Sequence, residues 1–214
     1  MHTILGLDPG LANVGYGLVR VEGNRYRHVE HGVISTQPQA GAGARLLQIR
    51  REVELLIRKH RPGSAAVERV YFSRNTASAL QVAEARGVLV LCLAEKGIPF
   101  GEYTPLEVKL GVLGRGSGRA EKRQVQEMLR LLLGLREPPR PYDAADALAL
   151  AVCHANRTTG PAALAGGAAA GGAPDALRRA GASAPEAGRR AGGPARGRGR
   201  RIAPGGAPRR RGAC

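Results

Sequence analysis

The order of the apolar segments constrains the fold of this chain more than any other feature. Three segments of strand-like length and composition open the sequence, at 3–8, 14–21 and 26–36. Gly23 and Asn24 separate the second segment from the third and are typical of a tight hairpin turn. The sequence therefore predicts three consecutive strands that pair as antiparallel neighbours.

Helices and strands alternate in the next part of the chain. Apolar residues recur at helical spacing before Pro62, at Leu46, Ile49, Val53, Leu56 and Ile57. The expected elements are a helix over 44–60, a strand over 64–72, a helix over 76–96, a strand over 98–103, and helices over 121–133 and 142–154. This order predicts an α/β fold: a five-stranded mixed sheet, with three antiparallel and two parallel strands, and helices on both faces.

The C-terminal part of the chain differs in composition from the rest. Residues 157–214 consist mainly of Gly, Ala, Pro and Arg, with few large apolar side chains. Such a segment buries too little surface to offset the entropy lost on ordering. We expect a folded domain over 1–156 and a disordered tail over 157–214. The tail either adds affinity for phosphates or is a neutral spacer.

The chain is strongly basic, with 33 Lys and Arg against 17 Asp and Glu and a formal net charge of +16. Such a charge suggests a polyanionic partner, nucleic acid or a membrane surface. The longest apolar stretch, 87–94, is far shorter than the roughly 20 residues that span a bilayer. Three cysteines without CxxC spacing favour a reduced, cytoplasmic setting.

Four acidic residues lie in apolar surroundings or close together. Asp8 ends the first buried strand, and Glu68 lies among apolar residues of the fourth. Asp143 and Asp146 are three residues apart at the start of the last helix, so they lie on one helix face. An unpaired carboxylate is costly to bury, so these positions need an explanation.

Each acid taken alone has an ordinary structural explanation. Asp8 is suited to a turn before Pro-Gly, and Glu68 to an ion pair with Arg69 or Arg86. Asp143 is suited to capping the last helix, where a second acid in the first turn would also be favourable. These alternatives remain open for each single residue.

The four acids together favour a metal site. If the first and fourth strands are neighbours, Asp8 and Glu68 lie close together, and gathered carboxylates need a cation. Oxygen ligands alone favour Mg²⁺ or Mn²⁺ over zinc. On a basic protein, such a site predicts two-metal phosphodiester hydrolysis. His154 lies about 16 Å further along the same helix, and we interpret it as a packing or surface residue.

The sequence resembles the RuvC-type crossover-junction (Holliday-junction) endonucleases of bacteria over about residues 1–155. The resemblance rests on segments in a shared order: ILGLDPGLANVGYG (4–17), AAVERVYFSRNTASAL (65–80), QVAEARGV (81–88), EYTPLEVKLGVLG (102–114), AEKRQVQEML (120–129) and DAADALALAVCH (143–154). It implies a ribonuclease-H-like fold and an Mg²⁺-dependent endonuclease. It also implies that the enzyme resolves four-way DNA junctions by paired symmetric nicks during recombination and repair.

The resemblance also implies roles for particular residues. Asp8, Glu68, Asp143 and Asp146 match the family's catalytic, metal-binding acids, with two Mg²⁺ per subunit and Mn²⁺ as a substitute. The residues expected to contact DNA are Tyr71, Phe72, Arg74, Lys109, Lys122 and Arg123.

The implied partners are a second copy of the chain, a junction-binding protein and a branch-migration motor. Ala79, Ala83 and Gly87 are small residues that recur every four positions. They fit either a dimer contact or core packing.

Three other functions compete with this interpretation. An actin-like or sugar-kinase ATPase would need a second domain, and no GxxxxGKS phosphate loop is present. A nucleic-acid-binding protein without catalysis would leave the inward acids unexplained. A ribonuclease-H-like RNA-processing nuclease shares the expected fold and is the nearest alternative.

Overall fold

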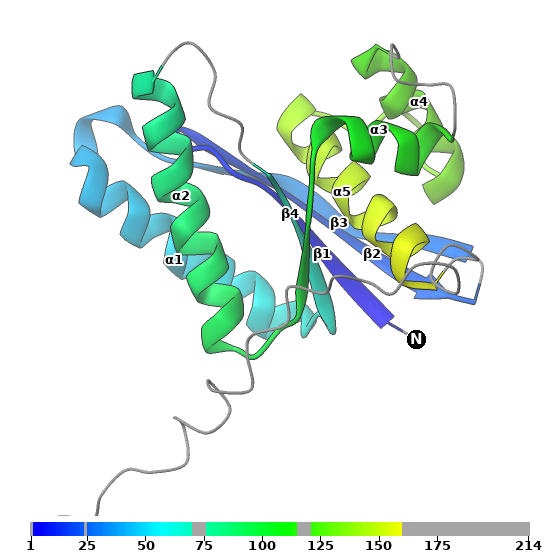
Figure 1. Cartoon of the computed structure of the whole chain (residues 1–214), viewed down its shortest axis with the longest axis horizontal. Helices are drawn as coiled ribbons and strands as arrows, with labels where there is room; N and C mark the ends of the chain where they lie inside the picture. The colour runs from blue at the N-terminus through cyan, green and yellow to red at the C-terminus, as the bar shows by residue number, and fades with distance from the viewer. Residues whose placement is uncertain (1, 24, 70–75, 115–120, 160–214) are drawn as a thin grey trace, which may run out of the picture.

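A five-stranded sheet forms the centre of the molecule (Figure 1). The computed structural model describes residues 2–23, 25–69, 76–114 and 121–159. Its elements in chain order are β1 (His2–Asp8), β2 (Asn13–Glu22), β3 (Arg25–Ser35), the 3₁₀ helix η1 (Pro38–Ala40), α1 (Gly41–His60), β4 (Ser64–Glu68), α2 (Thr76–Glu95), β5 (Phe100–Tyr103), α3 (Pro105–Leu113), α4 (Lys122–Leu133) and α5 (Tyr142–Thr159).

The strand order is β3-β2-β1-β4-β5. β2 runs antiparallel to both β1 and β3, whereas β4 runs parallel to β1 and β5 runs parallel to β4. The expected mixed sheet, with three antiparallel and two parallel strands, is therefore confirmed. A right-handed crossover through a helix is the usual way to join parallel strands. Helix α2 connects the parallel neighbours β4 and β5, and α1 connects β3 to β4.

Helices cover both faces of the sheet, as expected. Figure 1 shows α1 and α2 on one face and α3, α4 and α5 on the other. Alternate residues of β1 serve the two cores: Leu5 and Leu7 pack with α1 and α2, whereas Ile4 packs with α5. Gly6 and Asp8 share the α5 face with Ile4, because side chains alternate along a strand.

The face of the sheet beneath α5 carries three glycines, Gly6, Gly15 and Gly17. A Cβ atom at any of them would collide with the α5 backbone, at Ala147, Asp143 and Leu148 in turn. Gly6 and Gly17 also lie opposite each other in the β1–β2 ladder. These glycines allow α5 to lie directly on the strands, which carries the start of the helix to the end of β1.

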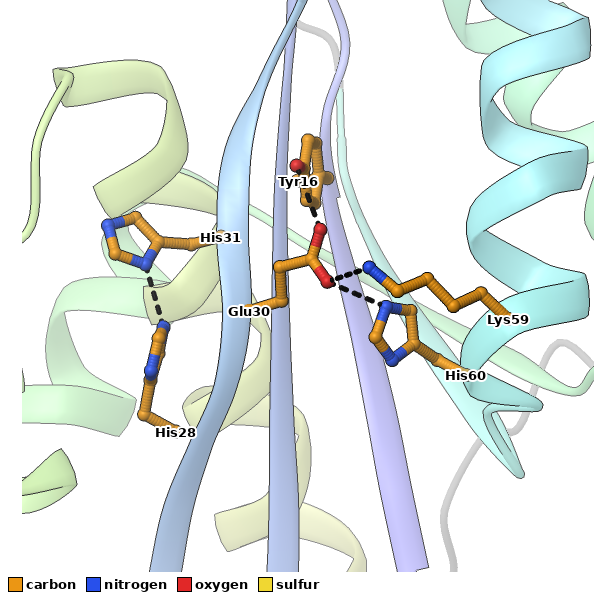
Figure 2. Close-up of polar contacts among 6 residues, drawn as sticks. All are labelled: Tyr16, His28, Glu30, His31, Lys59 and His60. Carbon is orange, nitrogen blue, oxygen red and sulfur yellow. Dashed lines mark hydrogen bonds and ion pairs between the residues drawn. The ribbon is translucent and has the colours of Figure 1, made fainter.

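The edge strand β3 is tied to α1 by a polar cluster (Figure 2). The Glu30 carboxylate accepts hydrogen bonds from Lys59 Nζ at 2.6 Å and Tyr16 Oη at 3.3 Å, and it lies 3.0 Å from His60 Nε2. Lys59 and His60 are the last residues of α1, so Glu30 fixes this end of the helix on the sheet.

Several element boundaries differ from those expected. The expected strand over 64–72 ends at Glu68, so this acid terminates the strand and does not lie in its middle; residues 70–72 lie outside the described part. The expected strand over 98–103 begins at Phe100. Helix α5 continues to Thr159, and Arg157 forms a 3.1 Å ion pair with Glu107.

Helix α3 was not expected. Thr104 caps it: the Thr104 side chain accepts a hydrogen bond from the Glu107 backbone N–H at 3.1 Å, and the Glu107 carboxylate accepts one from the Thr104 N–H at 2.9 Å. This reciprocal pair, with Pro105 in the first turn, is a helix-start signal that can be read from the sequence. The spacing of the apolar residues did not reveal this helix.

The expected tail lies outside the described residues from 160 onward, so its separation from the domain over 1–156 stays a prediction. In the described ranges, every helix is too short or too polar to cross a membrane.

Candidate active site

Asp8 and Glu68 lie at the carboxyl ends of two neighbouring parallel strands. In the β1–β4 ladder Leu7 pairs with Val67, so Asp8 and Glu68, the next residues of the two strands, lie side by side. The two carboxyl groups are hydrogen bonded to each other. The predicted adjacency of the first and fourth strands is confirmed. Arg86, a candidate partner of Glu68, instead pairs with Glu102 on β5.

Helix α5 adds the other two acids. Asp143 lies in its first turn and Asp146 one turn later, and both are partly exposed. Their charges reach Asp8, because both contribute to the shift in its pKa. Acids from β1, β4 and α5 therefore gather at one end of the sheet, on the α5 face.

The electrostatics of this group are unfavourable for full ionisation. Burial, then the neighbouring Glu68 and then Asp146 and Asp143 raise the pKa of Asp8 to about 9. Burial also raises the pKa of Glu68, with a smaller contribution from Asp146, although its hydrogen bond with Asp8 opposes the shift. The hydrogen bond between the two groups raises the pKa of Asp8 and lowers that of Glu68, as expected when Asp8 holds the proton and donates it to Glu68.

Lys122, the first residue of α4, is the positive charge closest to the acids in the described structure. Its ammonium lies 3.0 Å from Asp146 Oδ2 and 5.7 Å from the centre of the Tyr142 ring. The hydrogen bond with Asp146, followed by the charges of Asp146, Asp8 and Asp143, raises the pKa of Lys122. The lysine therefore serves as a counter-ion of the acidic group.

The donor set fits a hard divalent cation. Four carboxylates supply only oxygen, and a cation would relieve the repulsion that raises the pKa values of Asp8 and Glu68. Within the described ranges, no three Asp, Glu, His or Cys side chains already stand in an arrangement that could hold a metal ion. The Lys122 ammonium is the positive charge beside these carboxylates, 3.0 Å from Asp146 Oδ2.

The other residues expected at the site have different positions. Tyr71, Phe72 and Arg74 lie outside the described residues. Lys109 is a half-buried residue of α3, the short helix that follows β5. Arg123 is exposed on α4, next to Lys122. Among the expected DNA-contact residues that the structure describes, Lys122 is therefore the one whose ion pair places it directly at the acids.

His154 is a buried packing residue, one of the two roles expected for it. It is 5% exposed, and its ring nitrogens lie 2.8 Å from Tyr103 Oη and 3.0 Å from Ser64 Oγ. Sequence reasoning missed Arg140 and Tyr142, which line a pocket beside the acids together with Arg123. The one available signal was an aromatic residue directly before Asp143.

Comparison with known proteins agrees with this geometry. The family model described as "Crossover junction endodeoxyribonuclease RuvC" matches residues 4–154. The RuvC of Treponema denticola is 50% identical over 153 residues, which is 72% of this chain and 85% of that protein. The RuvC of Rubrobacter xylanophilus is 51% identical over 154 residues, again 72% of this chain and 85% of the relative.

Solved structures show the same fold. Thermus thermophilus RuvC in complex with a Holliday junction substrate has a TM-score of 0.70 and 36% identity, over 74% of this chain and 96% of that one. A second T. thermophilus RuvC structure has a TM-score of 0.68 and 37% identity, over 73% and 95%. The chain therefore belongs to the RuvC family of crossover junction endodeoxyribonucleases, nucleases with a ribonuclease-H-like fold that depend on a divalent metal ion.

Proposed function

We propose that this junction-resolving endonuclease works through Asp8, Glu68, Asp143 and Asp146, which hold two Mg²⁺ ions. Its substrate is a four-way DNA junction, which it resolves by paired symmetric nicks during recombination and repair. One observation carries the proposal: acids from β1, β4 and α5 meet on one face of the sheet and raise the pKa of Asp8 to about 9. A group of this kind is stable in its ionised form only beside concentrated positive charge.

The chemistry divides between the ions and the chain. When bound, the ions supply a water of lowered pKa and stabilise the charge on the leaving oxygen. Asp8 and Glu68 must release their shared proton in order to act as ligands together. Lys122 keeps its ammonium beside Asp146, where a scissile phosphate would also lie. Mn²⁺ has similar ligand preferences and should substitute for Mg²⁺.

A cleavage assay tests the proposal directly. A synthetic four-way junction and a linear duplex of the same sequence are incubated with the protein, with and without Mg²⁺. We expect symmetric nicks in the junction only, and only with the metal. Asp8→Asn and Glu68→Gln should abolish nicking, whereas Glu52→Gln, which changes an exposed acid on α1 across the sheet, should not. Full activity of Asp8→Asn would refute the assigned site.

The substrate also supports a homodimer, because two opposed nicks in a two-fold symmetric junction need two active sites. The expected stripe of small residues is not one surface, since Ala79 is 6% exposed and belongs to the interior. The exposed side of α2 instead carries Leu80 and Leu91, 62% and 51% exposed, with Gly87 between them. This face is our candidate for the dimer contact. Leu91→Glu should then yield a monomer in analytical ultracentrifugation, and an unchanged dimer would exclude this face.

Two further proposals follow from the family. The enzyme would share its junction with a junction-binding protein and a branch-migration motor. A cytoplasmic location is supported by a DNA substrate and by Cys92 and Cys153, which are free thiols in the interior.

A further inference from the structure

A pocket of about 760 Å³ opens between α4 and the segment that leads into α5. Such a volume lies within the usual range for binding sites of small organic groups. Besides two prolines, the residues that line it are Arg123, Gln124, Gln126, Glu127, Arg140 and Tyr142. None of these residues belongs to the four acids that would hold the metal ions.

The charge of the pocket is positive. Glu127 is the only acid among the described residues that line the pocket; it lies 2.6 Å from Arg130 Nη2 and is neutralised by that ion pair. Arg123 and Arg140 are both exposed, and in the described structure no acidic side chain lies within ion-pair distance of either. Two guanidinium groups free to form bidentate contacts make the pocket suited to a phosphate.

The walls of the pocket are held in place from two directions. Gln126 is buried, and its side-chain amide donates a 2.8 Å hydrogen bond to the Pro139 carbonyl. On the other side, His31 of β3 forms a hydrogen bond with the Arg140 backbone, and its ring also pairs with that of His28 at 2.7 Å (Figure 2). The pocket is thus a built feature and not a chance gap between two exposed loops.

The pocket lies next to the acidic group. Tyr142, on its wall, directly precedes Asp143 in α5. Lys122 connects the two places, because its ammonium lies 3.0 Å from Asp146 Oδ2 and 5.7 Å from the Tyr142 ring centre. The Tyr142 ring itself is 51% exposed and available for stacking.

We propose that this pocket holds a nucleotide of the junction strand adjacent to the cleaved phosphate. Arg123 and Arg140 bind the backbone phosphate of this nucleotide, and the Tyr142 ring stacks on its base. The inference rests on the proposed function, since it assumes that the scissile phosphate lies at the four acids. The pocket then fixes the position of the strand, and its residues act as positioning residues.

The test measures junction binding without metal, by fluorescence anisotropy, so that no cleavage occurs. Tyr142→Ala should weaken binding of an intact four-way junction about tenfold, the effect expected for the loss of one stacked base. Tyr142→Phe keeps the ring and should bind like the original protein. Arg140→Gln should weaken binding and reduce the salt slope by about one phosphate contact. The control is Arg51→Gln, an exposed arginine on α1, which should change nothing.

Abasic junctions identify the stacked base. One abasic nucleotide is moved stepwise through the centre of one strand, and the penalty of Tyr142→Ala should disappear at one position only. A penalty that persists at every position would overturn the stacking role. Affinities of Tyr142→Ala and Arg140→Gln equal to that of Arg51→Gln would overturn the whole inference. The nicking assay tests the proposed function independently of this binding assay. If the unmodified protein nicks the junction normally, the proposed function stands even when the pocket inference fails. If the unmodified protein does not nick the junction, the proposed function fails as well.

Discussion

Gly15 lies directly opposite Asp8 in the β1–β2 ladder, and the Asp143 backbone carbonyl occupies the space that a Gly15 side chain would need. Strand β1, which carries Asp8, is thus paired with β2 at a residue without a side chain. Helix α5, which carries Asp143 and Asp146, approaches the sheet at this glycine. The closeness of Asp8 and Asp143 depends on this missing side chain as much as on the acids themselves.

Gly15→Ala should therefore damage both stability and activity. The added methyl group meets the Asp143 carbonyl, so the start of α5 must move away from the sheet. We expect a loss of about 1–3 kcal/mol in the free energy of unfolding, as for other overpacked cores, and a large loss of junction cleavage. Urea unfolding and a nicking assay measure the two effects.

Gly43→Ala provides the matched control. Gly43 lies in α1, and a Cβ atom there would meet nothing within 4 Å. Its replacement should leave cleavage unchanged and leave stability equal or slightly higher. If Gly15→Ala behaved in the same way, close contact between α5 and β2 would not matter for the site.

Asp8→Asn should stabilise the metal-free protein at pH 8 while it destroys cleavage. The folded-state pKa of Asp8 is raised from 3.8 to about 9, so the folded state binds more protons than the unfolded state between these values. Stability is then lost as the pH rises through this window, and the amide removes that loss. We expect a gain of about 1–3 kcal/mol, together with retained junction binding.

Mg²⁺ should reverse this order of stability and make the unmodified protein more stable than Asp8→Asn. A ligand that binds only the folded state stabilises it, so Mg²⁺ should raise the melting temperature of the unmodified protein. Asp8→Asn should respond much less. Thermal unfolding at pH 8 with and without Mg²⁺ makes the comparison, and equal shifts in the two proteins would argue against Asp8 as a ligand.

Lys122→Gln should tighten Mg²⁺ binding but weaken binding of the junction. The lysine ammonium forms an ion pair with Asp146 at 3.0 Å and therefore competes with a cation for that carboxylate. Its loss should lower the Mg²⁺ concentration needed for thermal stabilisation, yet reduce junction affinity and its salt dependence by about one charge. The control is Lys96→Gln, which removes an ion pair with Glu54 on the opposite side of the sheet from the acids. The same Mg²⁺ titration of this variant should match that of the unmodified protein.

The sequence allowed the sheet and the meeting of the acids to be predicted, because both follow from short-range patterns and strand order. Asp8 and Glu68 are far apart in the chain, yet parallel pairing of their strands alone brings them together. The position of α5 was less accessible, since it depends on glycines whose role appears only when a helix lies on them. The pocket near Tyr142 could not be predicted, because contacts from Gln126 and His31 shape it across distant parts of the chain.

The buried His154 should make stability depend on pH in the acid range. Burial, with a smaller effect of nearby His2, lowers its pKa from 6.5 to about 4, and the neutral ring can serve both Tyr103 and Ser64. Between these values the unfolded chain binds a proton that the folded chain does not, so stability falls as the pH falls from about 6.5 to about 4. The full loss is about 3 kcal/mol. His154→Gln, which does not titrate, should show a shallower slope of unfolding free energy against pH in this window. Parallel curves for the unmodified protein and His154→Gln would show that another group governs the acid sensitivity.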